Sequence, residues 1–177
     1  MASAATLSFL LFASYSLLAT ATCTASDAVS SPDLHFYMHD DYAGPTQSAV
    51  RVVSGHSLNA STPTSPRQFG DVVAFSNALT AGPGLDTARV GTAQGFAVRV
   101  AERGTVSDLS MHLVMEDGSG SVDVKGRIDI EQAARQATVI GGAGRFLGAR
   151  GYVTTRNYGQ YDLATGGVVE IFVYLVQ

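Results

Sequence analysis

The sequence has little cysteine, no tryptophan and no cluster of like charges. The one cysteine, Cys23, lies near the start of the 177 residues, so the rest of the chain can form no internal disulfide. Its stability must therefore come from core packing or from oligomerisation. Eleven basic and fifteen acidic residues are mixed along the chain and give a net charge of −4 at pH 7. Because no basic run is present, we expect neither nucleic acid nor a membrane surface as a partner.

Long hydrophobic runs are absent too, apart from residues 7–18. This run is shorter than the roughly 20 residues of a membrane helix, and the small residues after it are typical of a secretory signal peptide. We expect residues 1–25 to be that signal peptide and residues 26–177 to form one secreted, extracellular domain. Asn59 begins a glycosylation sequon within a Ser, Thr and Pro-rich segment, which predicts a glycoprotein with an exposed loop there.

Helical periodicity is scarce, and short runs rich in Val, Ile, Phe, Tyr and Thr dominate the chain. Turn-forming residues bound these runs, a pattern typical of an antiparallel all-β domain. Such a domain must be a sandwich or a closed barrel, because open sheet edges promote aggregation. The last run, 168–176, is apolar on both faces apart from Glu170, so another subunit or the chain's own loops should cover its outer face. The expected strands are 34–40, 48–53, 71–75, 89–101, 108–116, 121–130, 136–140, 150–158 and 168–176.

A glycine-rich segment at 139–152 resembles a dinucleotide-binding loop. Its pattern Gly142-x-Gly144-x-x-x-Gly148 is close to the spacing that lets a helix N-terminus bind a pyrophosphate. The residues that follow are β-branched and aromatic rather than helix-forming. We therefore predict that this loop joins two strands.

Two segments carry side chains suited to chemistry. In the first strand, His35 and His39 would lie about 13 Å apart at roughly 3.3 Å per residue, which disfavours a shared metal ion. Asp40 ends that strand and is either an acid or base in a barrel or the cap of a turn. Arg150 and Tyr152 share one face of a later strand. If that face lines a cavity, a phenolic ligand would suit it, and otherwise both residues are ordinary surface groups.

Seven segments, taken in order, resemble the plant dirigent proteins along the whole of the expected domain. The resemblance implies an eight-stranded antiparallel β-barrel similar to that of allene oxide cyclase, assembled as a homotrimer or homodimer in the cell wall (apoplast). It also implies that phenoxy radicals, such as those of coniferyl alcohol, couple stereoselectively in lignan biosynthesis while a separate laccase or peroxidase oxidises them. No cofactor or metal is expected. The segments are FYMHD (36–40), FGDVV (69–73), LTAGP (79–83), VGTAQG (90–95), VIGGAGRF (139–146), ARGY (149–152) and VE (169–170).

The resemblance also assigns roles to particular residues. It implies Asp40 as the catalytic acid or base and Arg150 as an electrostatic clamp for a quinone methide oxygen. Tyr152 would bind the substrate close to Arg150, and Phe96 would shape the pocket. Two alternatives stay open, namely an intrinsic dehydratase or cyclase acting on a phenolic or isoflavonoid substrate, and a non-catalytic cell-wall defence protein.

Overall fold

Nine antiparallel β-strands make up the fold. The computed structural model describes residues 31–56, 67–102 and 105–176, and within these ranges it contains no helix, hence none that could cross a membrane. Each expected strand is present, and six are longer than expected, three of them by four or five residues because their pairing continues into the neighbouring turns. The strands are β1 (Leu34–Asp41), β2 (Ala49–Val53), β3 (Val72–Thr80), β4 (Arg89–Arg99), β5 (Val106–Met115), β6 (Gly120–Asp129), β7 (Arg135–Gly144), β8 (Arg150–Asp162) and β9 (Gly166–Val176).

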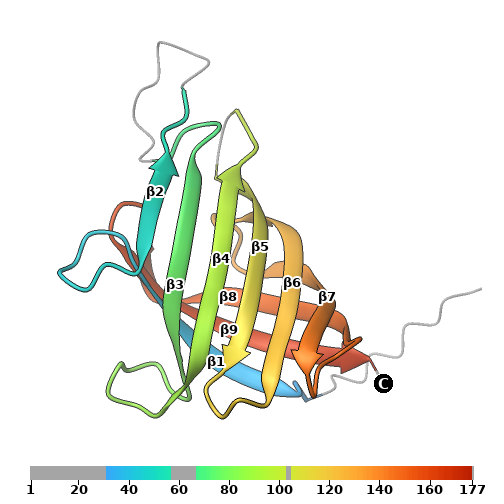
Figure 1. Cartoon of the computed structure of the whole chain (residues 1–177). Coiled ribbons are helices and arrows are strands. Elements are labelled where there is room, and N and C mark those ends of the chain that lie inside the picture. The colour runs from blue at the N-terminus through green and yellow to red at the C-terminus, as the bar shows by residue number, and fades with distance from the viewer. Residues whose placement is uncertain (1–30, 57–66, 103–104, 177) are drawn as a thin grey trace, which may run out of the picture.

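The sheet closes into a barrel through β1 and β3. Neighbouring strands follow the order β1-β9-β8-β7-β6-β5-β4-β3-β2, and β1 also pairs with the end of β3, where Met38 lies opposite Leu79. β2 pairs with the beginning of β3, where Ala49 lies opposite Phe75. β1 and β2 thus occupy one position in the ring, which confirms the expected eight-stranded antiparallel barrel (Figure 1).

The glycine-rich segment forms the end of β7, a tight turn and the start of β8. Gly144 and Gly148 have φ angles of +60° and +77°, a conformation that side chains with a Cβ disfavour. A Cβ at Gly144 would also lie 2.3 Å from the carbonyl oxygen of Ser119. The segment is therefore a strand connection, as predicted, and glycine is required there by close packing of the backbone.

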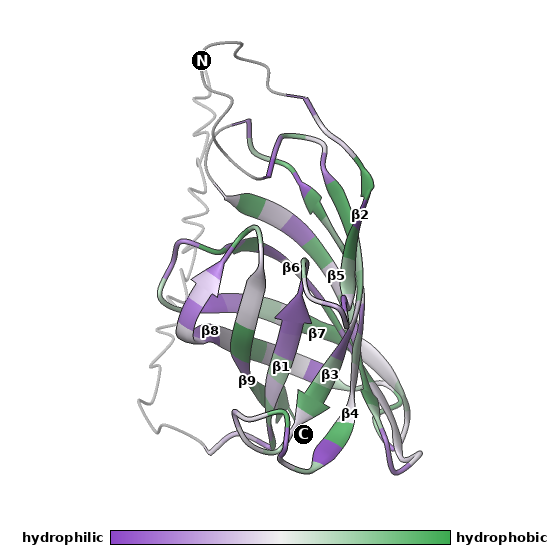
Figure 2. Ribbon diagram, turned by 90° about the vertical axis from the view of Figure 1, so that its left-hand side faces the viewer, coloured by the Kyte–Doolittle hydropathy of each residue, from purple (hydrophilic) through white to green (hydrophobic). Residues whose placement is uncertain are grey.

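Hydrophobic and hydrophilic residues alternate along parts of the strands (Figure 2), because successive side chains of a strand point to opposite sides of the sheet. On β5, Leu109, Met111 and Leu113 point inward and are buried, whereas His112 points outward and contacts Asp123. Interior residues at the end of β5, such as Leu113, belong to a tightly packed core. Those at its beginning line a cavity, so the two halves of the barrel interior differ: one is filled and the other is hollow.

Candidate functional site

The hollow half of the barrel holds a cavity of about 870 Å³, a volume that includes the space at its mouth. A concave site with a partly apolar lining suits a small organic molecule. Half of the 22 lining residues are aliphatic, methionine or phenylalanine, and the polar ones come from six of the strands and from the loops between strands. The apolar lining residues are Met38, Val73, Phe75, Ala97, Leu109, Met111, Ile128, Ile130, Leu163, Val169 and Ile171.

Asp40 is the central acidic group of this cavity. Its side chain points inward from β1, and the residue is only 8% exposed. Tyr161 donates its hydroxyl hydrogen to Oδ2 of Asp40 at 2.5 Å, and the amide of Asn77 donates to Oδ1 at 3.2 Å. Burial raises the pKa of Asp40, and hydrogen bonds from Tyr161, Tyr42 and Asn77 oppose this effect only in part. The environment therefore favours the protonated, neutral carboxyl, which can act as a proton donor.

Two glycines at the start of β9 allow the β8–β9 hairpin to approach Asp40. Gly167 pairs with Asp40, and a Cβ at Gly166 would lie 2.0 Å from the carbonyl oxygen of Asp40. The hairpin also carries Tyr161, which follows an irregularity in the β8–β9 register between Tyr158 and Tyr161. Tyr161 is in phase with the inward-facing Val153 and Thr155, and the two extra residues of this irregularity leave that alternation unchanged, so Tyr161 reaches the cavity whereas Tyr158 faces outward.

Tyrosine and arginine side chains surround the carboxyl of Asp40. Burial raises the pKa values of both Tyr42 and Tyr161, so their hydroxyl groups stay protonated and act as hydrogen-bond donors. The guanidinium of Arg67 lies 3.9 Å from the ring centre of Tyr42, a distance typical of a cation–π contact. Arg67 itself is 9% exposed and comes from the loop before β3.

Arg99 and Arg135 add two more buried cations to the cavity wall. Arg135 donates from Nε to the hydroxyl oxygen of Thr155 at 3.2 Å and from Nη1 to the side-chain oxygen of Asn157 at 2.9 Å. Burial lowers the pKa of Arg135. It also lowers the pKa of Arg99, and the positive charge of Arg67 contributes in the same direction.

Arg150, Tyr152 and Phe96 do not line the cavity, which corrects their expected positions. Arg150 is exposed and donates from Nη1 to the main-chain oxygens of Ile140 and Ala149, at 2.8 Å and 2.9 Å. Tyr152 is 42% exposed and Phe96 is 46% exposed. The reason is strand alternation: Val153 on β8 and Ala97 on β4 face inward, so the adjacent even-numbered positions face outward.

The remaining sequence predictions concern the glycosylation site, the signal peptide and a metal ion. Asn59 and residues 1–25 lie outside the described residues. His35 and His39 bind different groups, because Nε2 of His39 lies 2.7 Å from the hydroxyl of Thr80 whereas His35 contacts Glu170. In the described ranges of the chain, no three His, Cys, Asp or Glu residues come together as potential metal ligands.

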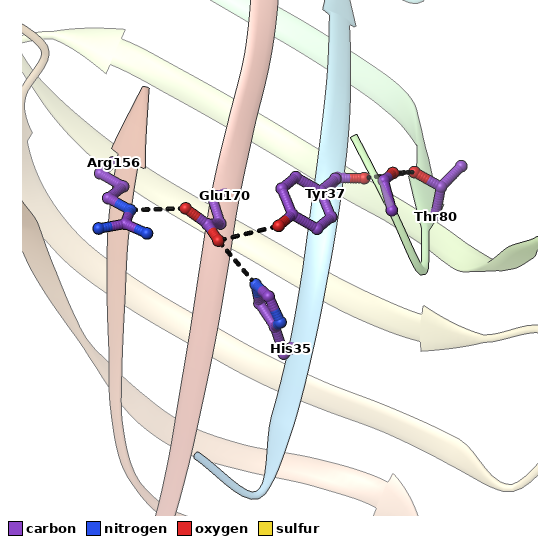
Figure 3. Close-up of polar contacts among 6 residues, drawn as sticks. His35, Tyr37, Thr80, Arg156 and Glu170 are labelled. Carbon is purple, nitrogen blue, oxygen red and sulfur yellow. Dashed lines mark hydrogen bonds and ion pairs between the residues drawn. The ribbon is translucent and has the colours of Figure 1, made fainter. Parts of the chain in front are cut away.

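A second buried carboxylate, Glu170, lies on the outer wall of the barrel (Figure 3). Its Oε1 lies 2.9 Å from Nε2 of His35 and accepts a hydrogen bond from the hydroxyl of Tyr37 at 3.0 Å. Its Oε2 accepts a hydrogen bond from Nε of Arg156 at 2.5 Å. Burial acts to raise the pKa of Glu170, but the hydrogen bonds from Arg156, His35 and Tyr37 outweigh it and lower the pKa. The carboxylate is therefore held in its charged form.

Aromatic rings surround this cluster on the outer surface of β1, β8 and β9. His35 stacks on Phe172 with ring centres 4.6 Å apart, and Tyr37 meets Tyr158 edge-on at 5.4 Å. Further along the same strands Tyr152 stacks on Tyr174 at 4.7 Å. We call the surface made by His35, Tyr37, Tyr152, Tyr158, Phe172 and Tyr174 the outer aromatic face.

The fold and the site together define a closed antiparallel β-barrel with a partly apolar cavity and a buried acid. More specifically, the chain belongs to the dirigent family, since the family model described as Dirigent-like protein matches residues 32–176. Dirigent protein 1 of Arabidopsis thaliana is 33% identical over 145 residues, covering 80% of this chain and 76% of that protein. Pterocarpan synthase 1 of Glycine max is 34% identical over 149 residues, with the same two coverages.

A solved structure of a pterocarpan synthase dirigent protein has the same fold. It superposes with a TM-score of 0.68 at 33% sequence identity, over 80% of this chain and 94% of that chain. The family and its barrel thus agree with the expectation from the seven sequence segments.

Proposed function

We propose that this protein binds phenolic radicals in the barrel cavity and steers their stereoselective coupling, as in lignan biosynthesis. A separate laccase or peroxidase would oxidise the phenol. The observation that carries the proposal is the cavity itself, in which partly apolar walls surround the carboxyl of Asp40 and its neutral donors Tyr161 and Asn77. Membership of the dirigent family supports the same function.

Asp40 would act after the radicals have joined. Coupling of two phenoxy radicals through their side chains gives a quinone methide, to whose methide carbon a hydroxyl group can add. As the new C–O bond forms, an electron pair moves to the quinone oxygen, which takes a proton from the carboxyl of Asp40. The hydroxyl that has added then returns its own proton to Asp40, so the acid is regenerated. The walls would hold one face of the methide toward the hydroxyl, which supplies the stereoselectivity.

An intrinsic dehydratase or cyclase is the second candidate. Two observations favour it: relatives named pterocarpan synthase are about as similar as the dirigent relatives, and the environment of Asp40 favours a protonated carboxyl. In this reaction Asp40 would protonate a hydroxyl group that leaves as water. Asp40 would then take the proton of the phenol as the neutral quinone methide forms. The quinone methide would close a ring by the same addition, in which Asp40 gives this proton to the quinone oxygen and regains one from the attacking hydroxyl.

The two functions differ in their need for an oxidant. We would incubate the purified protein with coniferyl alcohol, with and without laccase, and resolve the coupled products by chiral chromatography. A hydroxylated isoflavan without laccase serves as the second substrate. An enantiomeric excess only with laccase supports steering, and turnover of the isoflavan alone supports the dehydratase. Racemic coupling together with no isoflavan turnover would contradict both and favour the non-catalytic cell-wall protein.

Assembly and secretion are separate proposals. A second copy of the chain would cover the outer aromatic face in a homotrimer or homodimer, because exposed aromatic surface of this kind is typical of an interface. The test compares Tyr158→Lys with Phe96→Lys, since the two residues are 47% and 46% exposed and β8 and β4 are four strands apart around the ring. Light scattering should detect dissociation only for Tyr158→Lys, and an unchanged mass would contradict this interface. Secretion would follow if residues 1–25 are cleaved from the exported protein.

A further inference from the structure

The cavity carries more positive than negative charge. Among the described residues that line it, three are arginines (Arg67, Arg99 and Arg135) and two are aspartates (Asp40 and Asp71). All three arginines are at most 9% exposed. Even with both aspartates ionised the lining has a net charge of +1, and protonation of Asp40, which its raised pKa favours, increases that charge. A neutral phenol leaves this charge uncompensated.

Asp71 compensates only part of this charge, because it has other partners. Its carboxylate accepts main-chain hydrogen bonds from Gly55 at 2.7 Å and from Gln68 at 2.8 Å. Arg51 on β2 does not line the cavity, but its Nε lies 3.6 Å from Oδ2 of Asp71. Outside the cavity, Asp129 and Glu131 act on Arg99, and Asp129 lines a second pocket together with Arg135.

Arg135 is a buried cation whose hydrogen bonds are incomplete. Nε and Nη1 donate to Thr155, Asn157 and the carbonyl oxygen of Ile130, but Nη2 is buried and has no acceptor among the described residues. Buried polar groups are almost always hydrogen-bonded, and buried charges are normally paired. Thr155 also lines the cavity, and its hydroxyl accepts from Arg135, which leaves its own hydrogen free to donate to a ligand.

We propose that the cavity selects a phenolic ligand that carries a carboxylate, with Arg135 and Thr155 as the residues that recognise the carboxylate. The inference rests on the proposed binding of phenolic molecules in the cavity and specifies their class. A carboxylate matches the planar guanidinium and accepts the Thr155 hydroxyl hydrogen as well. Arg67 and Arg99, which line the same cavity, add attraction over a longer range.

Two ligands that differ in one group test this proposal. Ferulate and coniferyl alcohol share the ring, its substituents and the side-chain double bond, but one ends in a carboxylate and the other in a hydroxymethyl group. We would measure both dissociation constants by isothermal titration calorimetry near neutral pH. We expect ferulate to bind at least about tenfold more tightly, which corresponds to about 1.4 kcal/mol. Equal affinities, tighter binding of the alcohol or no measurable binding of ferulate would overturn the proposal.

Matched variants locate the carboxylate site. Arg135→Gln should lose the preference for ferulate and keep the affinity for the alcohol, whereas Arg150→Gln, the same change on the outer surface, should keep both. If Arg135→Gln does not fold, Thr155→Val serves instead and should reduce the preference several-fold. An unchanged preference in a folded Arg135→Gln or Thr155→Val variant would contradict the assignment. Stereoselective coupling of coniferyl alcohol without any preference for ferulate would reject this inference and leave the proposed function intact.

Discussion

Two buried carboxyl groups lie three residue positions apart on the same pair of strands, and the barrel treats them in opposite ways. Asp40 pairs with Gly167, and Glu170 pairs with Tyr37, so both belong to the β1–β9 ladder. They are 8% and 4% exposed, yet Asp40 points into the cavity and Glu170 points outward. The pKa of Asp40 is raised, whereas the pKa of Glu170 is lowered.

The partners of the two carboxyls explain the difference. Asp40 receives hydrogen bonds from the neutral groups of Tyr161 and Asn77, so burial determines the direction of its pKa shift. Glu170 contacts Arg156 and His35, and these contacts outweigh burial, which affects the pKa of Glu170 on the outer wall less than that of Asp40 beside the cavity. Neutral donors thus keep a buried acid able to release and accept a proton, whereas a cationic partner fixes it as an ion. The first arrangement suits chemistry and the second suits structure.

The largest expected effect comes from removing the acid inside the cavity. Asp40→Asn keeps the shape of the side chain but removes the exchangeable proton, so we expect stereoselective product formation to fall by about 100-fold or more. Chiral chromatography of the laccase-coupled products, or of the isoflavan reaction, measures this loss. The control is Asp108→Asn, because Asp108 is exposed and contacts Lys125 outside the cavity. Full selectivity in Asp40→Asn would show that its carboxyl takes no part in the reaction.

The corresponding change on the outer wall should affect stability instead. Glu170→Gln weakens the contacts with Arg156 and His35, and we expect a loss of about 1–2 kcal/mol, discounted because the Arg156 side chain is 56% exposed. Urea unfolding at fixed protein concentration measures it. Glu116→Gln is the matched control, since Glu116 forms an exposed pair with Arg89 and should change stability by less than about 0.5 kcal/mol. A Glu170 variant as stable as the control would mean that the buried network adds nothing.

Much of the fold was predictable from local sequence patterns. Alternating β-branched and aromatic residues defined the strands, and the residues after Gly148 ruled out a nucleotide-binding helix. The position of Asp40 at the end of a strand was also visible, and its cavity location agrees with the expectation from the family.

The rest of the site depended on information that the sequence does not state directly. The residues alone left the face of Arg150 open, because it could not be assigned without the closed barrel, and only the family resemblance implied a position inside. Arg135 is in phase with the buried Ala137 and Val139, and that signal could have identified it as an inward-facing cation. Tyr161 was missed because the expected strand 150–158 ends before it, although it is in phase with the inward-facing Val153 and Thr155.

The pH dependence of stability offers a smaller test with opposite signs at the two sites. Glu170 has a lowered pKa, so below its ordinary value of 4.5 the unfolded chain binds more protons and stability falls as the pH falls toward the folded pKa. Asp40 has a raised pKa, so above 3.8 the native state binds more protons and stability falls as the pH rises toward the folded pKa. Each contribution changes only between the unfolded and the folded pKa of its group and is constant outside that range.

Urea midpoints of the wild type and two variants, measured from about pH 3 to about pH 8, separate these contributions. In the wild type, ionisation of Asp40 lowers the stability as the pH rises. Asp40→Asn removes this loss, so the stability of the variant relative to the wild type should increase toward neutral pH. In the wild type, protonation of Glu170 lowers the stability as the pH falls. Glu170→Gln removes this loss, so the difference in stability between the variant and the wild type should become smaller at acid pH. If the stability of both variants relative to the wild type changes with pH in the same direction, the pKa values of the two carboxyls are not shifted in opposite directions and this comparison is wrong.

The smallest effect is expected at Arg150, where the distinction between the inner and outer surfaces of β8 is tested directly. Its guanidinium is exposed and contacts only the main-chain oxygens of Ile140 and Ala149 in the described part of the chain. Arg150→Gln should therefore change stability by less than about 0.5 kcal/mol and leave the enantiomeric excess of the coupled product unchanged. Chiral chromatography and urea unfolding measure both quantities. A loss of selectivity as large as that of Asp40→Asn would place Arg150 at the reacting molecule, which requires its side chain to leave the outer surface when substrate binds.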